Sequence, residues 1–152
     1  MFRKAKITDI DKLVEIVKTY QVNLENDALE ELERLILDEN SSVIIFEKEE
    51  IIAFMAYKKR KWGAEDIYWL EWLFVNQKYS RKGYGKKIYD YVENSLIEFG
   101  ARKLYVDIEN NESDFNKLAE KFHLNNGYKY EATLKDFWSD GQDYVLLSKR
   151  LM

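Results

Sequence analysis

Two glycines separated by one residue, Gly83 and Gly85, mark a place in this sequence where an anion could bind. They follow an apolar run that ends at Val75 and precede an amphipathic stretch, which predicts a loop between a strand and a helix. The first N–H groups of a helix have no internal partners, and glycine lets a phosphate approach the backbone. The neighbouring cations are Arg81, Lys82, Lys86 and Lys87. The pattern predicts a phosphate site, with a plain strand-to-helix turn on a basic surface as the alternative.

Two better-known phosphate loops fit this segment poorly. A Walker A loop needs Lys-Ser or Lys-Thr after its second glycine, but Gly85 is followed by two lysines. A dinucleotide fingerprint needs a third small residue where this chain has Ile88.

Glu71 is the residue whose type and position favour proton transfer. It is the one carboxylate inside the apolar run 67–75. Aromatic neighbours such as Trp69 would raise its pKa if it is poorly solvated, which moves a carboxylate toward a useful general base. The alternative is that Glu71 pairs with a lysine or arginine on a neighbouring strand.

The elements needed to position these residues form an α+β pattern. Strands are expected over 2–7, 43–46, 51–57, 67–75, 103–108, 128–134 and 144–151. Helices are expected from an N-cap at Thr8 through Tyr20, and over 27–38, 83–99 and 111–126. The expected buried stripes are Leu29, Leu32 and Ile36 on the second helix, and Tyr84, Ile88, Tyr91, Val92 and Phe99 on the third. Gly100 and Gly127 are expected to end the last two helices.

Composition limits the function classes. The 152 residues suit a single domain over 1–152, and the absence of cysteine excludes disulfides, a thiolate nucleophile and zinc-thiolate sites. No apolar run is long enough to span a bilayer and no signal peptide is evident, so a cytoplasmic protein without membrane contact is expected. The net charge of −4 disfavours general nucleic-acid binding and leans toward cationic partners such as amines. No metal site is expected.

Two segments resemble the GNAT superfamily of N-acetyltransferases. Residues 75–86 are similar to its acetyl-CoA loop, Arg/Gln-x-x-Gly-x-Gly/Ala, with Ser80 in the first position. Asn116-x-x-Ala119-x-x-Phe122-His123, followed by Gly127-Tyr128, is similar to a later family motif. The resemblance covers essentially the whole chain. It implies a mixed, mostly antiparallel twisted sheet flanked by about four helices, with acetyl-CoA as co-substrate.

The resemblance also implies roles for individual residues. The cofactor-binding set is Leu73, Phe74, Val75, Ser80, Arg81, Lys82, Gly83, Tyr84, Gly85, Lys86 and Asn116. Of these, Leu73 and Val75 would pair with the pantetheine arm through a splayed strand edge, and Asn116 would bind the same arm. The substrate-binding set is Tyr20, Asn23, Glu25 and Trp138.

His123 occupies the position of the family's tyrosine that protonates the leaving thiolate. A histidine can donate a proton but is largely neutral at pH 7, so it could instead act as a base or pack beside the cofactor. Tyr128 and Tyr79 are alternative donors. The strand around Glu71 is similar to that of spermidine/spermine-type acetyltransferases, in which a Leu-Glu pair carries the base. The catalytic pair that the resemblance implies is therefore Glu71 and His123.

The leading hypothesis is transfer of an acetyl group from acetyl-CoA to a primary amine by direct attack, with a small cationic amine or polyamine as acceptor. Residues 135–141 are equally similar to enzymes that acetylate protein N-termini, so a protein or peptide amine remains an alternative. A catalytically inert CoA-binding module is a second alternative, and a nucleic-acid-binding α+β domain is a third. The resemblance also allows a homodimer.

Overall fold

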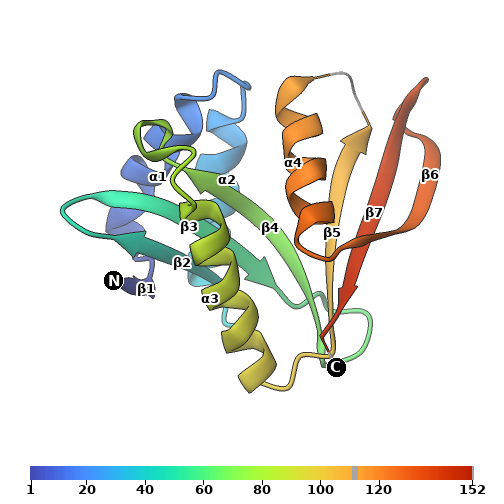
Figure 1. The fold of residues 1–152 in the computed structure, drawn as a ribbon, viewed down its shortest axis with the longest axis horizontal. Helices are drawn as coiled ribbons and strands as arrows, with labels where there is room; N and C mark the ends of the chain where they lie inside the picture. Colours follow the sequence, from blue (N-terminus) through green and yellow to red (C-terminus); the bar gives the residue numbers. More distant parts are fainter. Residues whose placement is uncertain (111–112, 152) are drawn as a thin grey trace.

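A seven-stranded sheet in the order β1-β2-β3-β4-β5-β7-β6 forms the centre of the computed structural model, which describes residues 1–110 and 113–151 (Figure 1). The strands are β1 Phe2–Lys4, β2 Ser41–Glu47, β3 Ile51–Lys58, β4 Ile67–Val75, β5 Lys103–Asn110, β6 Lys129–Ser139 and β7 Gln142–Arg150. Neighbouring strands are antiparallel except for β4 and β5. The predicted α+β class and the mostly antiparallel sheet are confirmed.

Four α-helices accompany the sheet in the described ranges: α1 Ile10–Lys18, α2 Glu25–Leu37, α3 Tyr84–Glu98 and α4 Asp114–Asn125. Two short 3₁₀ turns, η1 Ile7–Asp9 and η2 Gln77–Tyr79, precede α1 and follow β4. In this part of the chain, no helix is both long and apolar enough to cross a membrane.

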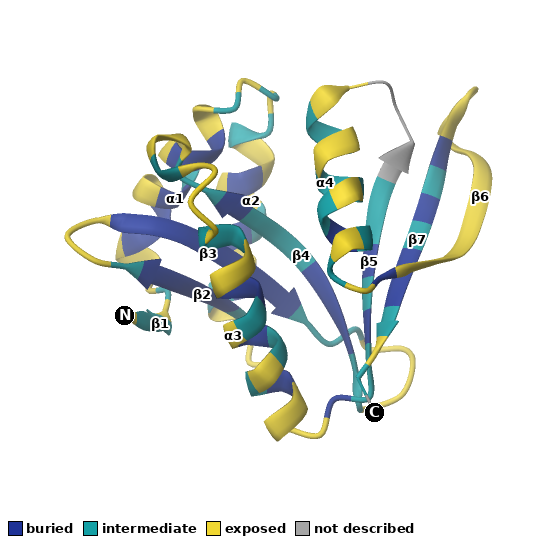
Figure 2. Cartoon of the chain, in the orientation of Figure 1, coloured by how far each residue is buried: buried dark blue, intermediate teal, exposed yellow. Residues whose placement is uncertain are grey.

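Two apolar clusters cover the two faces of the sheet. Helices α1 and α2 pack on one face with Phe54 and Phe74, while α3 packs on the other with Met55 and Leu104. Strand β3 is buried from Ile51 to Tyr57 because it is covered on both sides (Figure 2). By contrast, every residue of β6 is exposed. The core therefore lies around β2, β3 and β4, beside the strand that carries Glu71.

Strands β4 and β5 pair only at their beginnings. Their parallel register joins Ile67–Trp69 to Lys103–Tyr105, and beyond these residues the two strands diverge (Figure 1). The register between β3 and β4 passes from Tyr57↔Leu70 to Ala56↔Trp72, so Glu71 is the extra residue of a β-bulge. The sheet thus opens into a gap, with the bulge just beyond the last paired residues.

The predicted N-cap at Thr8 is wrong. Thr8 lies inside η1, and the Asp9 carboxylate accepts the Lys6 N–H at 2.7 Å. The Arg3 guanidinium holds Asp9 through bonds of 2.8 and 2.9 Å. The Asp9 carboxylate is thereby held at the backbone before η1, and Thr8 does not cap the helix, while β1 ends at Lys4 instead of reaching residue 7.

Two predicted buried stripes are shifted. Helix α2 begins at Glu25 and buries Ala28, Leu32 and Leu35, which leaves Leu29 44% exposed. Helix α3 buries Ile88, Tyr89, Val92 and Leu96, while Tyr91 and Phe99 are 40% and 70% exposed. In both helices the choice among nearby apolar residues is made by the sheet beneath them. Tyr91 instead stacks on Phe2 with ring centroids 4.0 Å apart.

The remaining helix ends follow simple rules. Gly100 and Gly127 adopt φ of +87° and +93° directly after α3 and α4, as predicted for glycine terminators. Helix α4 begins at Asp114, where the Ser113 hydroxyl accepts the Asn116 N–H. The predicted start at Asn111 lies outside the described residues.

Candidate active site

Beyond Trp69, the edge of β4 presents backbone groups that pair with no neighbouring strand to the gap. Asn76 N–H donates to Ile52 C=O at 2.8 Å, which makes Val75↔Ala53 a non-hydrogen-bonded pair. The N–H and C=O of Val75, and by alternation those of Leu73, therefore point away from β3 toward the diverging strand β5. This is the orientation required of a strand edge that pairs with an extended amide-containing ligand.

Phe74 is placed differently from its two neighbours. Its backbone groups point toward β3, and its ring packs among Tyr20, Phe54 and Phe115. Its predicted contact with a cofactor therefore has less geometric support than those of Leu73 and Val75.

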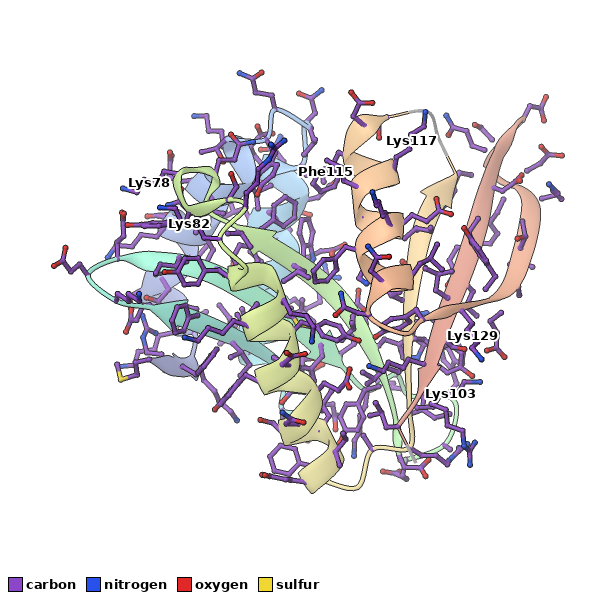
Figure 3. The ribbon with its side chains drawn as sticks, viewed as in Figure 1. Lys78, Lys82, Lys103, Phe115, Lys117 and Lys129 are labelled. Atoms are coloured by element: carbon purple, nitrogen blue, oxygen red, sulfur yellow. The ribbon has the colours of Figure 1, made fainter. Side chains whose placement is uncertain are left out.

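Tyr20 closes the outer end of this edge. Its hydroxyl donates to the Val75 carbonyl, and its ring meets the edges of Phe74 and Phe115 at 5.2 and 5.8 Å. Phe115 points from the first turn of α4 toward α1 and α2 (Figure 3). Tyr20, predicted as an acceptor contact, therefore lies against the predicted cofactor edge, where burial raises its pKa.

The loop between β4 and α3 forms an anion cradle. Lys87 N–H makes the first intrahelical bond, to Gly83 C=O at 3.0 Å, so the N–H groups of Tyr84, Gly85 and Lys86 have no partner within the helix. Arg81 and Gly83 both adopt left-handed backbone, with φ of +61° and +81°. These N–H groups and the positive end of the helix dipole suit a phosphate.

Gly85 lies next to β4 and α4 at the floor of this cradle. A Cβ on Gly85 would lie 3.5 Å from Val75 Cγ2 and 3.6 Å from Phe122 Cε2, which is ordinary contact distance. The start of α3 therefore neighbours both elements. Ser80, Arg81, Lys82 and Lys86 are exposed around it, with Lys86 paired to Asp90, and Figure 3 shows Lys78 and Lys82 projecting from the same segment.

Glu71 is a shielded carboxylate with two cationic neighbours. Its side chain is 16% exposed, and Oε1 lies 3.3 Å from Lys58 Nζ and 3.7 Å from Arg60 Nη2. Burial raises the pKa of Glu71, Lys58 and Arg60 oppose that rise, and Asp107 adds to it. The ion pairs named above as the alternative are present, together with the raised pKa that suits a base.

His123 is buried in an apolar setting. Its side chain packs against Phe122 and Tyr128, with ring centroids 5.7 and 5.4 Å away, and Nδ1 has no hydrogen-bond partner among the described residues. Burial lowers the pKa of His123 to about 4, so the ring is neutral at pH 7. A neutral imidazole can accept a proton more readily than it can supply one.

The alternative proton donors occupy two different environments. Tyr128 is 2% exposed beside His123, and burial raises its pKa beyond the usual range. The Tyr79 hydroxyl is bound instead to the Glu50 carboxylate at the surface. Of the two, only Tyr128 lies against His123.

Asn116 lies seven residues before His123 on α4, about two turns away on the same helical face. Its side chain is half-buried, and the helix cap is provided by Ser113. The placement is compatible with the predicted pantetheine contact.

The predicted acceptor residues lie on two separate elements. Asn23, with φ of +58°, and Glu25 lie in the connection to α2 and at its first turn, whereas Trp138 lies on the β6–β7 hairpin. Both segments are at the end of the sheet where β4 and β5 have separated (Figure 1). Trp138 is 52% exposed and its ring contacts Phe137 at 4.9 Å.

Sequence reasoning missed Lys58, Arg60 and Asp107. Arg60 Nη2 lies 3.4 Å from Asp107 Oδ2, and its guanidinium lies 3.6 Å from the centre of the Trp69 ring. For Asp107 the sequence offered one signal of a place near the site, since strand alternation puts it on the same face as Tyr105. The position of Arg60, in the irregular segment after β3, offered none.

Comparisons with known proteins agree with this geometry. The sequence profile of the acetyltransferase (GNAT) family matches residues 10–128. A protein from Desulfovibrio desulfuricans assigned to that family superposes with a TM-score of 0.86 at 18% identity, covering 100% of this chain and 99% of that one. An aminoglycoside 6′-N-acetyltransferase complexed with coenzyme A gives 0.80 at 15% identity, with coverages of 100% and 97%.

A third solved structure has a protein-directed name. Ribosomal-protein-alanine N-acetyltransferase from Brucella melitensis gives a TM-score of 0.72 at 20% identity and covers 99% of each chain. At such identities the likeness shows the shared fold. No curated protein sequence matches this chain.

Proposed function

The chain belongs to the acetyltransferase (GNAT) family, and on that premise we propose that it moves an acetyl group from acetyl-CoA to the primary amine of a small cationic acceptor. The observation that carries the proposal is the opened sheet. Backbone groups of Leu73 and Val75 face the gap directly before the anion cradle at Gly83–Lys86. A phosphate-bearing, amide-containing donor fits both features.

Acetyl-CoA supplies an activated thioester, so the protein needs to bind, orient and move protons without a covalent intermediate. The N–H groups of Tyr84, Gly85 and Lys86 would hold the pyrophosphate, while the edge of β4 and Asn116 would orient the pantetheine arm. Ser80, Arg81 and Lys82 would contribute backbone and charge around the phosphates.

Glu71 would remove the proton from the acceptor's ammonium group. Such an ammonium has a pKa near 10, so at pH 7 a base is needed to expose its lone pair. Glu71 lies at the bulge of β4, the strand that borders the gap, and its carboxylate is shielded from solvent. The leaving thiolate takes up a proton, which His123 would supply only as the imidazolium, and the adjacent Tyr128 hydroxyl is the alternative donor.

A small cationic amine is favoured as acceptor by two observations. The net charge is −4, and the strand around Glu71 is similar to that of spermidine/spermine-type acetyltransferases. Aminoglycosides, the substrates named for one structural relative, are also polyamines. Tyr20, Asn23, Glu25 and Trp138 would border the acceptor.

A protein N-terminus is the second candidate acceptor. Residues 135–141 are similar to those of enzymes with that activity, and one structural relative carries the name of a ribosomal-protein acetyltransferase. The proposal also includes a cytoplasmic location and a homodimer, and light scattering in solution tests the latter.

A thiol-release assay with an amine panel tests the proposal. We expect sustained acetyl-CoA-dependent release of free thiol with polyamines or aminoglycosides, and much slower release with peptides that present a free N-terminus. Faster turnover of the peptides would shift the acceptor to protein amines. Binding of CoA without turnover of any amine would support the inert-module alternative.

A further inference from the structure

Arg60 bridges the two strands at the point where the sheet opens. Trp69 and Tyr105 are the last paired residues of β4 and β5, and their rings stack with centroids 4.9 Å apart. Glu71 and Asp107 follow two residues later on the respective strands. The Arg60 guanidinium lies over Trp69 and reaches both carboxylates, at 3.7 Å from Glu71 and 3.4 Å from Asp107.

The surrounding charges divide the two oxygens of Glu71. Lys58 from β3 and Arg60 from the following segment both approach Oε1. The same oxygen of Asp107 that Arg60 approaches, Oδ2, also accepts the Tyr144 hydroxyl of β7 at 3.1 Å. Burial and the nearby Asp107 raise the pKa of Tyr144 to about 12, so Tyr144 adds no charge at neutral pH. Both ion pairs of Glu71 therefore involve Oε1, which is buried and accepts no hydrogen bond from the described residues.

We propose that Arg60 is a positioning residue for acetyl transfer: its guanidinium, anchored by Asp107 and Trp69, forms an ion pair with one oxygen of Glu71 and turns the other toward the acceptor. This inference rests on the proposed role of Glu71 as base. A planar guanidinium can stack on the Trp69 ring while its N–H groups reach sideways, and here one nitrogen, Nη2, approaches both Glu71 and Asp107. The residue type therefore matches the task.

The charges around Glu71 shift its pKa in opposite directions. Lys58 and Arg60 favour the ionised form of Glu71, whereas Asp107 disfavours it. Removing the charge of Arg60 raises the pKa of Glu71, while removing the charge of Asp107 lowers it. Loss of a purely structural contact would not shift the pKa of Glu71 in a direction set by the sign of the charge removed.

Two measurements on the full chain test this inference. One is the acidic limb of the kcat/KM pH profile, and the other is the ¹³C titration of the Glu71 carboxyl by NMR, assigned with Glu71→Gln. Arg60→Gln should move both midpoints upward by about one pH unit, and Asp107→Asn should move both downward. Arg60→Lys should restore the midpoint more fully than the rate, because the charge returns without the planar group that stacks on Trp69. Arg102→Gln, which removes an ion pair with Asp66, is the matched control and should move neither.

The outcomes separate the inference from the proposed function. Unchanged or same-direction NMR midpoints in Arg60→Gln and Asp107→Asn would overturn the inference, whatever the activity. Opposite NMR shifts with an unmoved kinetic limb would show that Glu71 is not the base, which overturns the proposed function and the positioning role together. If Arg60→Gln does not fold, the downward shift expected in Asp107→Asn and the near-wild-type midpoint expected in Arg60→Lys still decide between these outcomes.

Discussion

Glu71 combines two properties that a simpler carboxylate would not need together. It is shielded by the sheet, which raises its pKa, and it is paired with Lys58 and Arg60, which limits that rise. A base must be ionised at the working pH yet basic enough to accept a proton. Ion pairing at Oε1, on a residue that the bulge removes from the strand's regular alternation, is compatible with both requirements.

Replacement of Glu71 by glutamine tests its role as base. Glutamine keeps the size of the side chain but cannot take up the proton, so turnover should fall about 100-fold or more. The affinity for CoA, measured by isothermal titration calorimetry, should remain near that of the wild type because the anion cradle is untouched. Glu93→Gln is the control, since Glu93 is similarly shielded (17% exposed) and paired with Lys149 on α3's side of the sheet. Retention of most activity in Glu71→Gln would assign the proton to another group or to water.

Tyr20 makes a second prediction at the scale of a single residue. Its hydroxyl occupies the Val75 carbonyl, one of the groups expected to bind the pantetheine arm. Tyr20→Phe keeps the ring contacts with Phe74 and Phe115 and removes this competing bond, so CoA should bind about 2- to 10-fold more tightly. Tyr79→Phe, which removes a surface hydroxyl bond to Glu50, is the control. Weaker CoA binding in Tyr20→Phe would show that the hydroxyl assists the ligand.

Among the elements, the bounds of β4 could be predicted, whereas the contacts that Arg60 makes with this strand could not. The predicted bounds 67–75 match β4 because this run is apolar except for Glu71 and has polar or charged segments on both sides. The bulge at Glu71 and the contacts from Arg60 depend on which strands flank β4 and on where β5 diverges. Those are tertiary facts without a local signal. The same distinction explains the helix starts, since the Arg3–Asp9 pair overrides the capping signal of Thr8.

The cradle at the start of α3 depends on a left-handed glycine, which gives an element-scale prediction. Gly83 has φ of +81°, and no atom lies within 4 Å of the point that a Cβ would occupy, so Gly83→Ala costs about 1 to 2 kcal/mol of backbone strain without a clash. Relief of that strain would reorient the N–H groups of Tyr84 and Gly85. CoA affinity should fall at least tenfold by calorimetry.

Gly141 offers a close control for this substitution. It has φ of +79° and an equally open surrounding, in the turn between β6 and β7. Gly141→Ala should lower the melting temperature by about as much as Gly83→Ala does, because the backbone strain is similar, and should leave CoA affinity unchanged. Equal losses of CoA affinity in the two variants would refute a specific role for the loop at Gly83.

At the scale of the whole molecule, different kinds of element border the expected donor and acceptor sides of the gap. Helices α1 and α2 cover β2, β3 and β4 on the face opposite α3, and the connection between them reaches the open end of the gap (Figure 1). The β6–β7 hairpin, exposed along its whole first strand, borders the same end (Figure 2). The donor's expected path is thus enclosed by well-packed elements, whereas the acceptor's side is bordered by a connection and a hairpin. This contrast explains why sequence motifs identify the donor far better than the acceptor.

The single histidine makes the stability of the whole molecule depend on pH. Burial lowers the pKa of His123 to about 4 in the folded state, whereas an unfolded chain has a value near 6.5. Between these values the unfolded state binds the additional proton, so this contribution to stability is present above pH 6.5 and is lost as the pH falls toward 4. From pH 7 to pH 5 the unfolding free energy of the wild type should drop by about 2 kcal/mol more than that of His123→Phe. Urea denaturation at both pH values measures the difference, from which the carboxylates cancel. An equal drop in the two proteins would give His123 an ordinary pKa, and with it the ability to supply a proton to the thiolate near neutral pH.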